Sequence, residues 1–210
     1  MNTAELEQGP GRPSMKERQR QLREDAILDV AVEFLQTKGF NAMTLEDITE
    51  AIGISRPTLY QHFSSKEDVL IHVAIRNLRI VSDMLKGMDP ARSATDRLRE
   101  FIAWCIDRKF GANRETFYDM TRLVLSCGGT DPRLAEPQIV FMNDLEVLVE
   151  QAQKEGGVRN DVRAMLLAEV VVGAIKSIAF NRLIQEGRTN AEEITDGLIK
   201  LMFDQPTTSV

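Results

Sequence analysis

The stretch from Thr44 to Phe63 constrains the fold most, because it places two short helical patterns on either side of one glycine. Before the glycine, apolar residues repeat at helical spacing and mark one face: Leu45, Ile48, Ala51 and Ile52. Gly53 can adopt the left-handed conformation that ends a helix at little cost. Thr44 and Ser55 carry hydroxyls that suit helix N-caps. The pattern predicts a helix-turn-helix, a motif whose second helix lies in the DNA major groove.

The same stretch resembles the DNA-binding core of the TetR family (TetR/AcrR-like) of bacterial transcriptional regulators. The matching residues are Gly53-Ile54-Ser55-Arg56-Pro57-Thr58-Leu59-Tyr60-Gln61-His62-Phe63, followed by Ser65-Lys66-Glu67 and Val69-Leu70. The match extends from about Ile27 to Leu70 with its spacing intact, which makes it far more specific than a helix-turn-helix pattern alone. The resemblance implies an all-α chain of about nine helices, with a three-helix head that binds DNA and a C-terminal body for ligand binding and dimerisation.

The second helix of the motif carries the residues that we expect to meet DNA. Arg56 can grip guanine O6 and N7 with two N–H donors, or it can pair with a phosphate. Pro57 suits the first turn of a helix, where a missing N–H costs little. The resemblance places Pro57 and Thr58 where the family's recognition helix meets bases. Tyr60 either offers its hydroxyl to a phosphate or packs as a half-buried ring, and Gln61 is a weaker candidate.

Residues at the helix ends complete the predicted interface. Thr44 can present its hydroxyl and the helix-terminal N–H groups to a phosphate, and Lys66 can neutralise one. Ser55 caps the second helix with or without a phosphate contact, and His62 either lies near the DNA backbone or packs in the head. The predicted DNA-binding set is Thr44, Ser55, Arg56, Pro57, Thr58, Tyr60, Gln61, His62 and Lys66.

The remaining chain divides by its turn signals. Residues 1–15 are expected to form a flexible arm, in which Arg12 either enters an A·T minor groove or belongs to a disordered tail. Residues 16–65 form the predicted DNA-binding domain, 66–86 a connecting helix that begins with a Ser64–Glu67 capping box, and 87–210 the body. The body reads as helices at Ser93–Lys109, Glu115–Ser126, Pro132–Lys154, Val162–Glu186 and Ala191–Phe203.

The helix expected over Val162–Glu186 is apolar nearly all round, so it must be buried on more than one side. In the resembling family the last two long helices form a dimer interface, and a dimer supplies two recognition helices to a palindromic operator in double-stranded DNA. A monomer with a generous core is the alternative. The predicted interface residues are Val170, Ala174, Ile178, Leu198, Leu201 and Met202.

Large apolar side chains and methionines in the body suit either a pocket for a small hydrophobic effector or a plain core. The candidate pocket residues are Phe101, Trp104, Cys105, Phe117, Met120, Phe141, Met142 and Leu145. The resemblance implies that effector binding moves the connecting helices and releases the operator, as expected of a repressor. Two alternatives remain, namely thiol redox control through Cys105 or Cys127 and control by a protein partner.

Composition narrows the function further. The formal net charge is −6, yet residues 12–23 hold five basic side chains against one acid, so one end of the molecule suits DNA. The sequence shows no P-loop, dinucleotide glycine pattern or nucleophile elbow, and it has two histidines, so we expect no enzyme activity, cofactor or metal. We expect a cytoplasmic protein without membrane contact, because no apolar run reaches the ~20 residues that span a bilayer and no secretory signal is visible.

Overall fold

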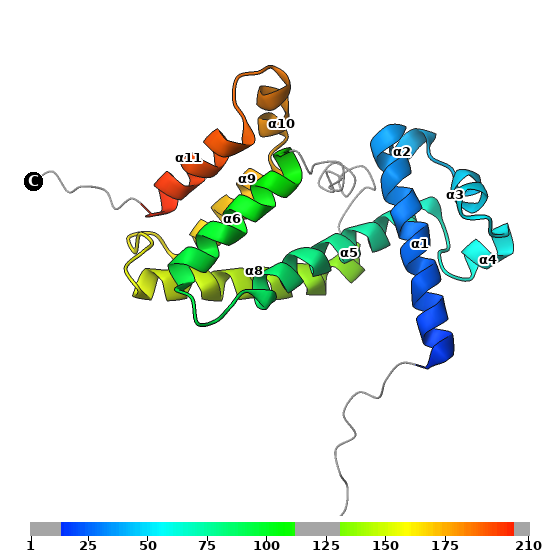
Figure 1. Cartoon of the computed structure of the whole chain (residues 1–210), viewed down its shortest axis with the longest axis horizontal. Helices are drawn as coiled ribbons and strands as arrows, with labels where there is room; N and C mark the ends of the chain where they lie inside the picture. Colours follow the sequence, from blue (N-terminus) through cyan, green and yellow to red (C-terminus); the bar gives the residue numbers. More distant parts are fainter. Residues whose placement is uncertain (1–13, 112–130, 204–210) are drawn as a thin grey trace, which may run out of the picture.

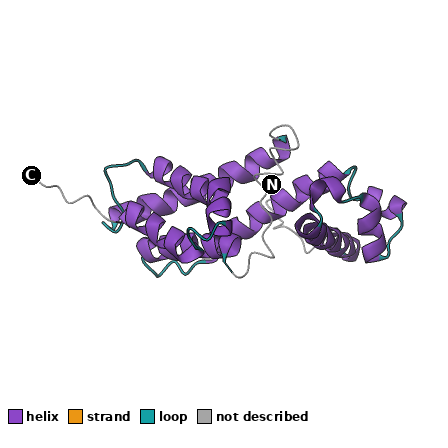
Figure 2. Ribbon diagram, turned by 90° about the horizontal axis from the view of Figure 1, so that it is seen from above, coloured by secondary structure: helices purple, strands orange, loops and turns teal. Residues whose placement is uncertain are grey.

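The computed structural model describes residues 14–111 and 131–203, which form ten helices and no strand within these ranges (Figures 1 and 2). The helices are α1 (Met15–Thr37), α2 (Gly39–Ala42), α3 (Leu45–Ile52), α4 (Arg56–Tyr60), α5 (Lys66–Gly87), α6 (Ala94–Phe110), α8 (Pro132–Lys154), α9 (Ala164–Lys176), α10 (Ile178–Gln185) and α11 (Ala191–Phe203). The all-α class is thereby confirmed. The helix expected at Glu115–Ser126 lies outside the described residues.

Two separate hydrophobic cores organise the molecule. We call the first the head core, and it joins α1, α3, α4 and the first half of α5 through Ile27, Leu28, Ala31, Leu35, Met43, Ile48, Leu59, Phe63, Val69, Leu70 and Val73. The second, the body core, joins the end of α5 to α6, α8, α9 and α11. Figure 1 shows α5 running from the head into the body beside α8. A single helix therefore contributes to both cores.

Helix α1 shows how the amphipathic pattern produces the head. Ser14 and Glu17 form a capping box at its start, and Ile27, Ala31 and Leu35 lie on its buried face. Gly39, in the left-handed region with φ 77°, redirects the chain into the short helix α2, which the sequence pattern did not predict.

The prediction of one continuous helix over Val162–Glu186 was wrong. The chain breaks at Ser177, where the backbone is extended (ψ 120°), and α9 and α10 meet at a bend of 44°. The Ser177 hydroxyl accepts from the Phe180 N–H at 3.4 Å and so caps α10. In a continuous helix the Ile175 carbonyl would accept from the N–H four residues on, but here the buried Lys109 Nζ donates to it.

None of the described helices is by itself long and apolar enough for a membrane span, and α9 with α10 passes that test of length and composition only when the bent pair is joined.

Candidate nucleic-acid interface

The start of α3 is fixed by a reciprocal cap. The Thr44 hydroxyl accepts from the Asp47 N–H at 3.1 Å, while the Thr44 N–H donates to Asp47 Oδ2 at 2.8 Å. Lys38 Nζ lies 2.6 Å from the same carboxylate oxygen. The hydrogen bonds from Lys38 and Thr44 lower the pKa of Asp47 to about 2. The N-terminus of α3 is therefore tied to the end of α1.

The turn after α3 depends on Gly53, whose φ of 76° lies in the left-handed region. The N–H groups of Gly53 and Ile54 both donate to the Thr49 carbonyl, at 2.9 and 3.1 Å. The Ile54 side chain packs against the head core. Two backbone hydrogen bonds and the packing of Ile54 thus fix the turn, which sets the angle between α3 and α4.

Helix α4 is anchored on one face and exposed on the other. Ser55 caps it by accepting from the Thr58 N–H at 3.3 Å, and the two hydroxyls lie 2.8 Å apart. Leu59 and, just beyond the helix, Phe63 are buried in the head core. Six of the nine predicted DNA-binding residues are exposed to solvent, and Thr58, His62 and Lys66 are partly buried. The exposed six are Thr44, Ser55, Arg56, Pro57, Tyr60 and Gln61.

Arg56 makes an ion pair that the sequence pattern did not reveal. Its Nη2 lies 2.8 Å from Glu46 Oε1 of α3, and the two side chains are 63% and 41% exposed. Exposed pairs of this kind contribute about 0–1 kcal/mol. The guanidinium can therefore exchange Glu46 for another anion at small cost. Ten positions separate the pair in sequence, and only the turn brings them together.

His62 and Lys66 are engaged inside the head. His62 is 5% exposed, with Nδ1 3.1 Å from Glu24 Oε1. Burial acts to raise the pKa of Glu24, but its contacts with His62 and Arg20 outweigh this and lower it. Lys66 Nζ donates to the Phe40 carbonyl at 3.0 Å and lies over the Phe40 ring. The geometry favours the packing interpretation of His62, and a DNA contact by either residue stays a prediction.

The cap of α5 differs from the predicted Ser64–Glu67 pair. Ser65 is the N-cap and accepts from the Asp68 N–H at 3.1 Å, whereas Ser64 donates its N–H to Asp68 Oδ2 at 2.8 Å. The acid that closes the motif is therefore Asp68, one residue later than expected.

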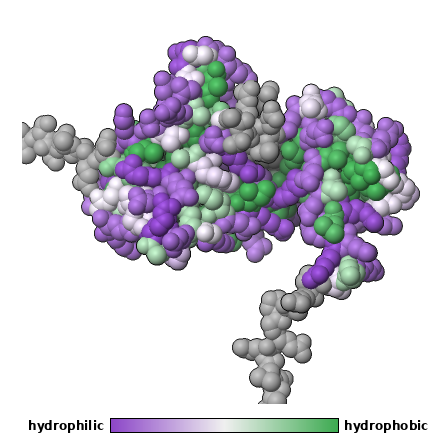
Figure 3. Space-filling view, in the orientation of Figure 1, coloured by the Kyte–Doolittle hydropathy of each residue, from purple (hydrophilic) through white to green (hydrophobic). Residues whose placement is uncertain are grey.

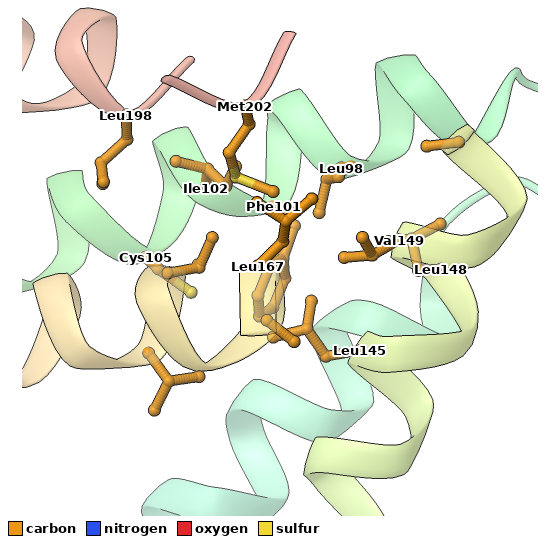
Figure 4. Close-up of a cluster of buried hydrophobic side chains, with 14 of the residues drawn as sticks. Leu98, Phe101, Ile102, Cys105, Leu145, Leu148, Val149, Leu167, Leu198 and Met202 are labelled. Carbon is orange, nitrogen blue, oxygen red and sulfur yellow. The ribbon is translucent and has the colours of Figure 1, made fainter. Parts of the chain in front are cut away.

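The predicted pocket residues meet in the body core. Phe101, Cys105, Phe141 and Leu145 are buried there, several of them converging in Figure 4, and Trp104 and Met142 pack partly buried against them. Burial raises the pKa of the Cys105 thiol well above its usual range, which opposes thiolate formation. Phe117, Met120 and Cys127 lie outside the described residues.

Among those that are described, no group of three or more His, Cys, Asp or Glu side chains could hold a metal ion.

The predicted dimer residues divide into two groups. Val170, Ile178 and Leu201 are exposed, and Leu201 reaches 60%. Leu198 and Met202 are buried in the chain's own body core, with Ala174 packed partly against it. Hydrophobic surface shows on both head and body in the space-filling view (Figure 3).

Comparison with known proteins agrees with this geometry. Residues 27–73 match the profile of bacterial regulatory proteins of the tetR family. The HTH-type transcriptional regulator EthR of Mycolicibacterium smegmatis is 49% identical over 49 residues, which is 23% of each chain. The HTH-type transcriptional activator FasR of the same organism is 35% identical over 108 residues, or 49% of this chain and 48% of FasR. The chain thus spans less than half the length of these relatives.

A solved structure extends the likeness in fold to most of the chain. The fatty acid degradation regulator FadR from Bacillus halodurans covers 88% of this chain and 96% of its own, with 18% sequence identity and a TM-score of 0.68. The matched profile contains the capped α3, the glycine turn and α4, and the body has the same fold as that neighbour. On this evidence of motif, sequence and fold, residues 27–73 belong to the tetR family of bacterial regulatory proteins, and the chain as a whole shares the fold of the FadR structure.

Proposed function

We propose that the protein is a homodimeric transcriptional repressor that binds a palindromic operator through α4 and leaves it when a small hydrophobic effector binds the body. One observation carries the proposal. Ser55, Leu59 and the turn at Gly53 anchor helix α4 on the head, while Arg56, Tyr60 and Gln61 are exposed to solvent. Such a face suits a polar, anionic groove.

The contacts that we propose follow from the exposed groups. Arg56 exchanges Glu46 for guanine or a phosphate, and the Tyr60 hydroxyl accepts or donates at the DNA backbone. Thr44 lies at the N-terminus of α3, where free N–H groups favour an anion. The start of α1 adds exposed basic side chains on the head: Lys16, Arg18, Arg20 and Arg23. These cations can favour DNA at one end of the molecule although the formal net charge of the whole chain is −6.

Dimerisation is supported by exposed apolar side chains on the last three helices: Met165, Leu166, Val170, Ile178 and Leu201. We infer that these side chains form one surface, because contiguous exposed apolar patches mark interaction sites. A two-fold interface there gives two copies of α4, which matches the symmetry of a palindrome.

For the effector we propose an acyl chain as the first class to test. The body core is apolar over α6, α8, α9 and α11, and the neighbour in fold is named as a regulator of fatty acid degradation. The effector must bind the released state more tightly than the DNA-bound state, because equal affinity would shift nothing. Redox control through Cys105 is disfavoured by its burial and raised pKa.

The test begins with a selection of genomic fragments that the purified protein retains, followed by titration of the selected fragment. Long-chain fatty acids and their coenzyme A thioesters are then added to the preformed complex. We expect a palindrome among the selected fragments and release by one acyl compound but not by its short-chain analogue. Failure to select any sequence would overturn the regulator proposal, whereas selection without release would overturn only the acyl effector.

A further inference from the structure

The start of α8 holds Arg133 in a fixed direction. Asp131, the N-cap of α8, accepts from Arg133 Nε at 3.0 Å and from Nη2 at 2.9 Å, and it also accepts from the Arg133 backbone N–H at 2.9 Å. These bonds raise the pKa of the guanidinium and lower the pKa of Asp131 to about 2. A planar guanidinium bound along one edge leaves its remaining donors aimed in one direction.

That direction leads to Asp68 on α5. Arg133 Nη1 donates to Asp68 Oδ1 at 2.6 Å, and His72 Nδ1 lies 3.3 Å from the same oxygen. The other carboxylate oxygen accepts from the Ser64 N–H at 2.8 Å and from its hydroxyl at 3.0 Å. Burial acts to raise the pKa of Asp68, but the bonds from Ser64 and Arg133 outweigh it and lower the pKa. One carboxylate therefore joins α8 to the turn that follows α4.

An apolar contact supports the same junction. Leu134, the neighbour of Arg133, is 2% exposed and packs with Ile71 and Ala74 in a small cluster separate from the head and body cores. The opposite face of α5 at this level carries Val69, Leu70 and Val73 in the head core. The first half of α5 is thus clamped between the head and the start of α8.

We propose that Arg133 is a positioning residue that transmits a change in the position of α8 to α4. It acts through its bond to Asp68, while Leu134 packs α8 against α5. When the bond from Arg133 is present, Asp68 stays fixed and holds Ser64, so the turn between α4 and α5 keeps one conformation. When α8 shifts, Asp68 loses its anchor and the recognition helix loses its rear support. The expected effect on operator affinity rests on the function proposed above. The expected effect on the conformation of the turn between α4 and α5 does not.

The direct test is hydrogen exchange, read on peptides that cover residues 59–69. We expect Arg133→Ala to speed exchange there by about fivefold or more, the lower range of usual coupling between sites. Arg133→Lys, which keeps the charge but offers one ammonium in place of the planar fork, should recover part of the protection. Arg159→Ala is the matched control, because Arg159 makes a similar pair with Asp161 within the body, at 2.6 Å.

Operator affinity gives the second readout. Arg133→Ala should weaken operator binding by about fivefold or more. In an Asp68→Asn background the same substitution should change exchange and affinity little, because the carboxylate that Arg133 pairs with is already gone. Unchanged exchange at residues 59–69 in Arg133→Ala, or equal acceleration in Arg159→Ala, would overturn the proposal. If Arg133→Ala unfolds, Arg133→Gln, which removes the charge but keeps most of the length of the side chain, carries the same exchange test. If the wild type binds no operator, the exchange result still decides whether Arg133 orders the turn between α4 and α5.

Discussion

The substitution Gly53→Ala separates backbone strain from steric conflict at the turn. Gly53 has a φ of 76°, and a Cβ built there would meet nothing within 4 Å. The cost is therefore conformational alone, about 1 kcal/mol for a left-handed L-residue. For a chain of this size, about 1 kcal/mol lowers the melting temperature by about 2–4 °C.

Thermal unfolding at one fixed protein concentration measures this change, since dimer stability depends on concentration. Gly87→Ala is the matched control. Gly87 is the last residue of α5, also has open space around its Cβ and lacks a left-handed φ, so alanine there should be neutral or stabilising by up to about 1 kcal/mol. Equal melting temperatures for the two variants would show that the left-handed backbone at Gly53 carries no cost for alanine. A loss well above about 2 kcal/mol at Gly53 would reveal a clash that the geometry excludes.

Three further changes test other parts of the structure. Lys109→Met removes the donor to the Ile175 carbonyl and should cost about 1–3 kcal/mol in urea unfolding; no loss would show that the carbonyl finds another partner. Leu201→Glu places a charge on the exposed apolar surface and should convert a dimer to a monomer in sedimentation, whereas an unchanged mass would remove this surface from the interface. Asp47 has a folded pKa lowered to about 2, so its stabilising effect is complete above the ordinary value and disappears as the pH falls from about 4 to about 2. The difference in melting temperature between wild type and Asp47→Asn should therefore shrink over that range, and a constant difference would contradict it.

Local signals explain why the candidate site was predictable. Thr44, Gly53 and Ser55 act through their own backbone conformation or through an N–H three residues away, so sequence alone places them. The apolar residues that anchor α4 follow from the helical repeat in the same way. The caps at Thr44 and Ser55, the left-handed Gly53 and the buried anchors of α4 were all confirmed as structure, although contact with DNA stays a proposal.

Long-range contacts explain what the sequence did not reveal. His62 meets Glu24 across 38 positions, and Arg133 meets Asp68 across 65. No periodicity encodes such pairs, because they arise only when helices pack. The sequence does not predict the break at Ser177 for a related reason: the apolar repeat continues through it, and the buried Lys109 that donates to the Ile175 carbonyl comes from another helix.

Fluorescence anisotropy with wild type, Arg56→Ala and Arg92→Ala tests whether the exposed face of α4 binds DNA selectively. Arg92 is an exposed arginine that pairs with Glu100 in the body, so it controls for the loss of one positive charge. On the selected fragment, Arg56→Ala should weaken binding by about tenfold, the scale of one good base or phosphate contact, and Arg92→Ala should match the wild type. Equal affinities for wild type and Arg56→Ala, or equal losses in both variants, would contradict the assignment of α4 as the DNA-binding surface.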